Sequence, residues 1–403
     1  MTPRRRPRRS SLPDRPDRAI SRALVNGRVL LDEGLSEGRG VLIEDGRIAD
    51  ILPAGDRRCR RAQRHDLGGA LLLPGFLDSQ VNGGGGVLFN DSPDLESIRT
   101  IGRAHRRFGT TGFLPTLISD DLETIARAIA AVDAAIETQV PGVLGIHIEG
   151  PFLNVARKGV HDPAKLRRLD TSAVRLLTSL RAGRTLVTLA PEMAAPGVIA
   201  ALVAAGVVVS AGHTNATYDE IAAALRHGLT GFTHLFNAMS QLTGREPGTV
   251  GAALEDPASW CGIIVDGEHT HPAVLRLALK CKPADRFMLV TDAMPSVGTG
   301  LSSFELQGRR IRVSGSVCLD EDGRLAGSNI DMASCVRNAI DLLGLPLPQA
   351  IRMASRSPAE FLRLGHETGR IARGYRANLV AADEQLTVLD TWIDGRPARE
   401  EPG

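Results

Sequence analysis

Apolar residues are concentrated in eight short runs along the central part of the chain, and most runs lead into a segment with helical spacing. The runs cover residues 75–80, 112–119, 143–150, 185–192, 206–214, 231–238, 261–269 and 287–293. Near-continuous apolar runs are typical of strands buried on both faces, and amphipathic segments such as 122–137 and 218–227 predict helices between them. Eight strands linked by helices predict an α/β fold, a (β/α)8 barrel of the TIM type.

Short strands separated by glycine turns predict a second, smaller unit at the two ends of the chain. They occur between residues 23 and 74 and return at 377–380 and 388–393. A doubly wound sheet is the alternative for the centre, but it would not need the chain to return to an N-terminal β module. The expected organisation is a disordered Arg- and Pro-rich tail at 1–22, a small β-sandwich domain formed by 23–74 and 371–403, and the barrel at 75–370.

The charge of the chain is small once its first residues are set aside. The 403 residues are 43% hydrophobic and 23% charged, with a net charge of +2, which is typical of a globular protein with a sizeable core. Seven Arg and two Asp give residues 1–18 a charge of +5, so the remainder carries −3. With only 3% aromatic residues, this mildly acidic body offers neither a basic groove nor stacking surfaces. A nucleic-acid partner is therefore not expected.

Neither a membrane nor an oxidising compartment is indicated. No apolar run approaches the length that crosses a bilayer, and the first residues lack the apolar stretch of a secretory signal. The five cysteines are scattered, with no Cys-x-x-Cys pair, which fits neither a disulfide framework nor a zinc–thiolate site. We expect a cytoplasmic protein that does not bind membranes.

Polar residues recur at or just past the C-terminal ends of the apolar runs. Any one of them alone is more simply explained as a capping or turn residue. Their recurrence at the same phase of the runs is harder to explain by turn chemistry, and in a barrel these strand ends meet at one mouth, where active sites lie. The residues are His147, Glu149, Glu192, His213, His234, Asn237, Asp266, His269 and Asp292.

Three of these residues predict a catalytic metal site. Glu149, His213 and His234 supply one carboxylate and two imidazoles, a set that leaves a coordination position open for water. We expect one divalent metal ion per subunit. Zinc is the first choice, and iron, manganese or cobalt would fit the same ligands. Asp292 could take a proton from water and return it to a leaving group. His147, on the same side of its strand as Glu149, is expected beside the ligands rather than among them.

The motifs around these residues resemble those of the N-acetylglucosamine-6-phosphate deacetylases of the amidohydrolase superfamily. HIEGPF at 147–152, SAGHTNAT at 210–217 and THLFNAM at 233–239 are together very specific. The resemblance extends in order from about residue 68 to 383 and leaves out the Arg-rich N-terminal segment. Other matching segments are QVNGGGG (80–86), KGVHDP (158–163), TGREPG (243–248), VTDA (290–293) and LAGSN (325–329).

Carried over position by position, the resemblance implies a role for each site residue. Glu149, His213 and His234 would hold the metal, and Asp292 would be the acid/base. Arg245 would hold the 6-phosphate, since a guanidinium can make two charge-assisted bonds to an anion. In the family this contact can come from a neighbouring subunit, which implies a homodimer. The full set of implied substrate contacts is Val160, His161, Asn237, Ala238, Arg245, His269, Leu325, Ala326 and Gly327, the last three on a loop.

One departure from the superfamily concerns the number of metal ions. Many amidohydrolases end the first barrel strand with His-x-His, which helps to bind a second ion, whereas this chain has Gln80-Val81-Asn82. Neutral amides are poor ligands for a transition metal beside imidazoles. A single-metal site is therefore expected, as in some members of the family that the chain resembles.

The reaction implied by the resemblance is hydrolysis of the acetamide of N-acetyl-D-glucosamine 6-phosphate to D-glucosamine 6-phosphate and acetate, in amino-sugar catabolism. The sequence does not distinguish this substrate from the epimeric N-acetylgalactosamine 6-phosphate. A non-catalytic sugar-phosphate binder on the same fold is a further alternative, but a binder would not need Asp292. A cyclic-amide hydrolase would be favoured by a carboxylated lysine after the fourth strand, and residues 185–192 contain no lysine.

Overall fold

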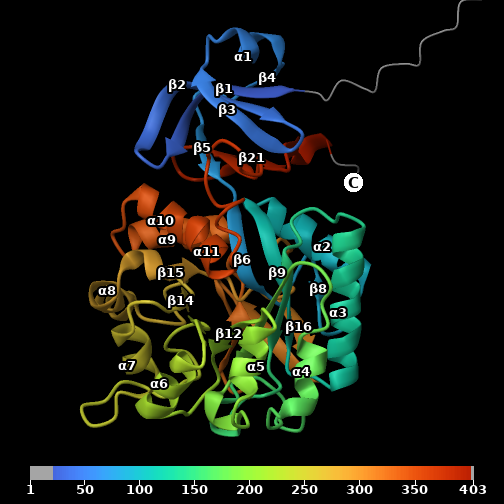
Figure 1. The fold of residues 1–403 in the computed structure, drawn as a ribbon, viewed down its shortest axis with the longest axis vertical. Coiled ribbons are helices and arrows are strands. Elements are labelled where there is room, and N and C mark those ends of the chain that lie inside the picture. The colour runs from blue at the N-terminus through green and yellow to red at the C-terminus, as the bar shows by residue number, and fades with distance from the viewer. Residues whose placement is uncertain (1–20, 401–403) are drawn as a thin grey trace, which may run out of the picture.

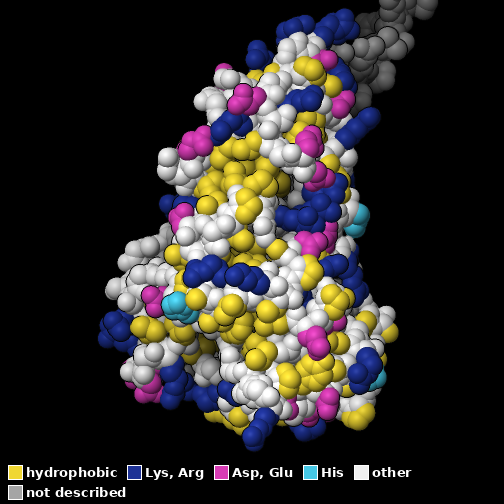
Figure 2. All heavy atoms as spheres, turned by 90° about the vertical axis from the view of Figure 1, so that its left-hand side faces the viewer, with side chains coloured by type: hydrophobic (Ala, Val, Ile, Leu, Met, Phe, Trp, Pro, Cys, Tyr) yellow, Lys and Arg dark blue, Asp and Glu magenta, His cyan; other side chains and the backbone are white. Residues whose placement is uncertain are grey.

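The computed structural model describes residues 21–400 as an α/β barrel with a smaller sheet domain packed at one end (Figure 1). Of the tail predicted at 1–22, residues 1–20 lie outside the described part. Within residues 21–400, no helix has the length and apolar character needed to cross a membrane. On the face shown in Figure 2, Lys and Arg side chains lie in separate groups between apolar and acidic ones rather than in one continuous groove.

Each of the eight predicted apolar runs overlaps one strand of a parallel sheet, which confirms the barrel. Every residue of the strands at 76–81, 110–118 and 145–149 is buried, as expected for strands covered on both faces. In their order across the sheet, the strands are β15 (Phe287–Leu289), β14 (Trp260–Ile263), β13 (Gly231–Phe232), β12 (Val208–Ala211), β11 (Arg184–Leu189), β10 (Gly145–Glu149), β9 (Thr110–Ile118) and β6 (Phe76–Val81).

The barrel closes between β6 and β15 mainly through residues that follow β15. Asp292 donates its backbone N–H to the carbonyl oxygen of Gln80 at 3.0 Å. The buried carboxylate of Asp78 accepts hydrogen bonds from the hydroxyl group of Thr291 and, at 3.3 Å, from its backbone N–H. Burial raises the pKa of Asp78 to about 7. A polar contact thus joins the two edges of the sheet.

Helices cover the outside of the barrel between the strands (Figure 1). The two segments predicted to be helical form α3 (Leu122–Glu137) and α6 (Tyr218–Arg226). A capping box of Thr217 and Glu220 starts α6. The other helices of the barrel are α2 (Leu95–Arg106), α4 (Thr171–Leu177), α5 (Val198–Ala204), α7 (Gly248–Glu255), α8 (Pro272–Cys281), α9 (Met332–Asp341), α10 (Leu347–Ala354) and α11 (Arg356–Phe361), with 3-10 turns η1 (Val155–Arg157), η2 (Pro191–Met193) and η3 (Ala284–Arg286).

Both ends of the described chain build the smaller domain, as predicted. Strand β20 pairs antiparallel with β5, which joins the C-terminal strands to the N-terminal ones. Leu24, Ile48, Leu72 and Trp392 are fully buried in their shared core. The elements are β1 (Arg22–Leu31), β2 (Gly34–Glu44), β3 (Arg47–Pro53), α1 (Arg57–Arg61), β4 (Gln63–Asp66), β5 (Leu71–Pro74), β20 (Leu379–Ala382), β21 (Val388–Ile393), β22 (Arg396–Pro397) and the 3-10 turn η4 (Ala398–Glu400).

An antiparallel sheet after β15 was not predicted from the sequence. The expectation of a loop at 325–327 is wrong, because these residues belong to its last strand. Its strands are short and partly polar, as in RRIRVS at 309–314, so they do not stand out in the hydrophobic pattern. The strands are β16 (Ser303–Leu306), β17 (Arg309–Ser314), β18 (Val317–Leu319) and β19 (Leu325–Ser328), and a smaller pair follows β6, namely β7 (Gly83–Gly84) and β8 (Val87–Leu88).

Candidate active site

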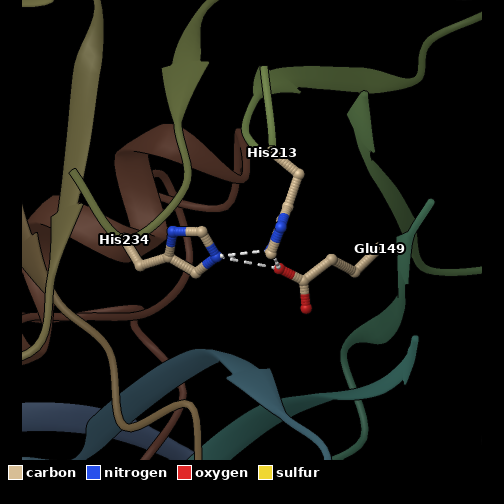
Figure 3. A group of neighbouring side chains, drawn as sticks. All are labelled: Glu149, His213 and His234. Carbon is tan, nitrogen blue, oxygen red and sulfur yellow. Dashed lines mark hydrogen bonds and ion pairs between the residues drawn. The ribbon is translucent and has the colours of Figure 1, made fainter. Parts of the chain in front are cut away.

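The three predicted metal ligands lie together at the mouth of the barrel. Glu149 is the last residue of β10, and His213 and His234 each follow the end of a strand by two residues. Glu149 Oε1 lies 3.0 Å from His234 Nε2 and 3.3 Å from His213 Nε2. The two Nε2 atoms are 3.1 Å apart. All three side chains are buried and point toward one another, Glu149 from the end of β10 and the two histidines from just beyond β12 and β13 (Figure 3).

The backbone at this mouth adopts conformations that residues other than glycine rarely take. His213, His234 and Asp292 have φ values of 48°, 34° and 52°. Such left-handed conformations cost of the order of 1 kcal/mol each and persist where the surrounding structure imposes them. The fold thus holds the side chains of these three residues at the mouth at the expense of local stability.

The tautomer of His213 makes the cluster suitable for a cation. His213 Nδ1 lies 2.9 Å from the backbone carbonyl oxygen of Arg157, and a carbonyl only accepts, so Nδ1 carries the proton. In the imidazole form with this Nδ1 proton, Nε2 presents a lone pair to Glu149 Oε1, another acceptor, at 3.3 Å. Two acceptors this close need a positive charge or a proton between them. His234 Nδ1 is buried without a hydrogen-bond partner among the described residues. The three residues fit a divalent metal ion.

Asp292 is held by the two amides that replace the His-x-His pair. Its Oδ1 accepts hydrogen bonds from Asn82 Nδ2 at 2.6 Å and from Gln80 Nε2 at 3.1 Å. Gln80 Nε2 also lies 3.2 Å from both carboxylate oxygens of Glu149. The amides thus donate to the carboxylates and orient them. Burial, followed by the negative charge of Glu149, raises the pKa of Asp292 to about 6.

Two further histidines are oriented by neighbouring polar groups. His269 Nδ1 hydrogen-bonds to the carboxylate of Asp266, which also accepts the backbone N–H of His269 at 2.9 Å. His161 Nδ1 lies 3.3 Å from the backbone N of Ser119 and 2.7 Å from its hydroxyl oxygen. Since a backbone N–H only donates, the proton of neutral His161 is on Nε2. Burial lowers the pKa of His161 well below its usual value, so that the ring is neutral.

A cavity of about 340 Å³ collects most of the predicted substrate residues in front of the ligand cluster. Larger cavities among the described residues contain none of them, so chemistry rather than size distinguishes this one. Predicted residues that line it are Val160, His161, Asn237, Ala238, His269, Leu325 and Gly327, together with Glu149, His213, His234 and Asp292.

Two predicted substrate residues lie elsewhere, and one basic lining residue was not predicted. Ala326 is fully buried and does not line the cavity. Arg245 is exposed in the loop between β13 and α7, outside the cavity. Arg157 is the one Lys or Arg among the described lining residues, and its Nε donates to Asn215 Oδ1 at 2.9 Å. Because the chain is rich in arginine, nothing in the sequence pattern distinguished Arg157 from the others.

His147 and Glu192 support the site without joining the ligand cluster. His147 Nδ1 lies 3.1 Å from Thr116 Oγ1, and its Nε2 lies 2.8 Å from Thr188 Oγ1, inside the barrel. Burial lowers the pKa of His147 to about 4, so the ring is neutral. Glu192 accepts hydrogen bonds from Thr214 Oγ1 at 2.6 Å and from the backbone N of Asn215 at 2.7 Å. Glu192 therefore fixes the segment that carries His213.

Comparison with known proteins agrees with this geometry. The model of the amidohydrolase family matches residues 71–398, which include the whole barrel. The chain belongs to the amidohydrolase family. Members of this family depend on metal ions, in agreement with the Glu149, His213 and His234 cluster.

Several members of the amidohydrolase family are similar to this chain over nearly its full length. An N-acetylgalactosamine-6-phosphate deacetylase of a Shewanella species is 43% identical over 92% of this chain and 95% of its own. An N-acetylglucosamine-6-phosphate deacetylase of Haemophilus influenzae is 36% identical, with 93% and 98% covered. The crystal structure of the N-acetylglucosamine-6-phosphate deacetylase of Pasteurella multocida has a TM-score of 0.90 at 35% identity, over 94% of this chain and 99% of that one.

Proposed function

We propose that this chain hydrolyses the acetamide of N-acetyl-D-glucosamine 6-phosphate to D-glucosamine 6-phosphate and acetate. The observation that carries the proposal is the convergence of Glu149, His213 and His234 beside Asp292 in one cavity. The names of the relatives support it, since both the H. influenzae and the P. multocida proteins are N-acetylglucosamine-6-phosphate deacetylases. The reaction would belong to amino-sugar catabolism.

One divalent ion per subunit would be held by Glu149, His213 and His234, and zinc suits a set of two imidazoles and one carboxylate. When bound, such an ion supplies Lewis acidity at the amide and lowers the pKa of water. Asp292 accepts a proton from the attacking water and returns it to the departing amine. Its Oδ2 serves this role, because both hydrogen bonds that the described residues donate to the Asp292 carboxylate are to Oδ1.

The remaining lining residues position the sugar. His161, with its proton on Nε2, donates a hydrogen bond to the substrate. His269, whose ring is oriented by the hydrogen bond between its Nδ1 and Asp266, also contacts the substrate. We assign the phosphate to Arg157 within the same chain. Arg245, which lies outside the cavity, would reach the phosphate of a substrate bound to the second subunit of a homodimer.

The cytoplasm is the compartment that we propose for this reaction. All five cysteines lie in the described part of the chain and are free. Four of them, Cys59, Cys261, Cys318 and Cys335, are buried thiols whose pKa values are raised by that burial. Unpaired thiols are usual in a reducing compartment.

The epimer N-acetylgalactosamine 6-phosphate is the second candidate substrate, because the Shewanella relative at 43% identity carries that name. Acetate release from both epimeric phosphates and from unphosphorylated N-acetylglucosamine distinguishes the possibilities. We expect the glucosamine derivative to have the highest kcat/KM and the unphosphorylated sugar to be a poor substrate. A higher kcat/KM for the galactosamine derivative would favour the second candidate, and no acetate from any of them would refute the deacetylase proposal.

A further inference from the structure

The tip of the β16–β17 hairpin reaches across to the wall of the cavity. Gln307 and Gly308 form its two-residue turn, with φ values of 49° and 75°, and Leu306 pairs with Arg309 next to them. Asn, Asp and Gly are the residues that such turns prefer. Turn chemistry therefore does not explain a glutamine with a positive φ at the first turn position.

The side chain of Gln307 bridges two segments of the barrel mouth that are far apart in sequence. Its Nε2 donates to the carbonyl oxygen of Ser119 at 2.8 Å, and its Oε1 accepts the backbone N–H of Asp162 at 2.9 Å. Both partners are backbone groups with fixed roles, one acceptor and one donor, so only one orientation of the amide satisfies both. A shorter side chain or a carboxylate could not make the same pair of bonds.

Both segments that Gln307 joins also determine the orientation of His161. Asp162 is the next residue after His161, and Ser119 supplies the groups that lie 3.3 Å and 2.7 Å from His161 Nδ1. His161 is 2% exposed, and its ring lies edge-on to that of His213 with the centroids 4.4 Å apart. The chain of contacts thus runs from the hairpin tip through Ser119 and Asp162 to a histidine that lines the cavity.

We propose that Gln307 is a positioning residue, which holds the 158–162 segment against Ser119 and so directs the Nε2–H of His161 toward the substrate. The β16–β19 sheet would then shape the site from two places, since Leu325 and Gly327 of β19 line the cavity as well. This inference rests on the proposed function, in which His161 contacts the substrate. Apolar packing of Leu306 and Ile311 holds the hairpin on the barrel independently of the amide.

A double-mutant cycle of Gln307→Ala and His161→Ala tests this coupling. We expect Gln307→Ala to lower kcat/KM for N-acetylglucosamine 6-phosphate by about 10- to 100-fold, the scale of a small misplacement of a substrate-contacting group. In the His161→Ala background, the same change should alter kcat/KM by less than about 2-fold, because coupled residues are not additive. Gln307→Glu, which keeps the bond to Asp162 but loses the donor to Ser119, should lie in between. Equal losses in both backgrounds, or no loss in the wild-type background, would overturn the proposal.

Hydrogen exchange of the 158–162 segment provides a readout that needs no substrate. Gln307→Ala should speed the exchange of the Asp162 amide, and unchanged exchange would refute the coupling whatever the activity. Arg310→Ala is the matched control, since Arg310 lies exposed on the same hairpin; it should leave both exchange and kcat/KM at wild-type values. If wild-type protein releases no acetate, the proposed function fails, while the exchange measurement still decides whether Gln307 holds this segment.

Discussion

Asp292→Asn separates proton transfer from every other contribution to the site. In the wild-type chain, Asp292 Oδ1 accepts the hydrogen bonds from Asn82 at 2.6 Å and from Gln80 at 3.1 Å. The amide oxygen of an asparagine can accept the same two bonds, so the side chain should keep its place. The change removes the second oxygen as a proton acceptor and leaves the three metal ligands untouched.

The expected effect is large and has a defined pH dependence. General acid–base catalysis contributes about 10²- to 10⁴-fold, or about 3–5 kcal/mol, so kcat should fall by at least 100-fold. The pKa of Asp292 is raised to about 6. Because the base must be ionised to accept a proton, wild-type kcat/KM should fall tenfold per pH unit below this pKa. A bound divalent cation would stabilise the ionised carboxylate of Asp292, so the fall in kcat/KM should begin at or below about pH 6. The kcat/KM of Asp292→Asn should not show this fall.

The assay is acetate release across pH 4.5–8, accompanied by metal analysis and substrate binding for each variant. Substrate should still bind to Asp292→Asn, and the metal content should match that of the wild type. Glu305→Gln on the exposed part of the β16–β17 hairpin is a control for an acid-to-amide change and should leave kcat unaltered. Turnover of Asp292→Asn within tenfold of the wild type, with the metal retained, would refute the role of Asp292 and direct attention to His269.

Elemental analysis should find one tightly held divalent ion per chain, because Gln80 and Asn82 donate to carboxylates instead of binding a second ion; two ions per chain would contradict this. Arg157→Ala should lower kcat/KM for the phosphorylated sugar about 10- to 100-fold, mainly through KM, since a charge-assisted contact contributes about 1.5–3 kcal/mol. Arg245→Ala should do the same only if sedimentation shows a dimer. Asp78→Asn should raise the free energy of unfolding by about 4 kcal/mol at pH 8 and by little at pH 4. Burial raises the pKa of Asp78 from 3.8 to about 7, so the ionised form destabilises the fold as pH rises through this interval; denaturant unfolding at both pH values measures it.

The barrel could be predicted because its strands are buried on both faces. Runs such as 143–150 and 206–214 are almost continuously apolar, and each ends in a polar residue, so both the strands and the direction of the mouth follow from the pattern. The antiparallel sheet at 303–328 could not be predicted in this way. One of its faces packs on the barrel while the other is exposed, and its strands have six residues or fewer.

The candidate ligands could be predicted because the chain has only ten histidines, so histidines at the ends of the apolar runs stand out. Arg157 was not predicted for the opposite reason. Arginine is so common in this chain that the sequence does not distinguish an arginine on the cavity wall from the others. The bridging role of Gln307 depends on contacts with residues 145 and 188 positions away. Contacts over such separations follow from the packing of the β16–β19 sheet, which the pattern did not predict.

The closure of the barrel and the orientation of the acid/base depend on the same residues. Gln80 accepts the backbone N–H of Asp292 through its carbonyl oxygen and donates to the Asp292 side chain through Nε2. One residue further back, Thr291 is tied to Asp78 on the first strand. A barrel with a full ladder between β6 and β15 would place Asp292 in an extended conformation, whereas the observed φ of 52° turns its side chain into the mouth. Strands β6 and β15 share no continuous hydrogen-bond ladder, and this is where Asp292 can depart from extended strand geometry. Polar side chains supply contacts between these two strands that a ladder would otherwise make.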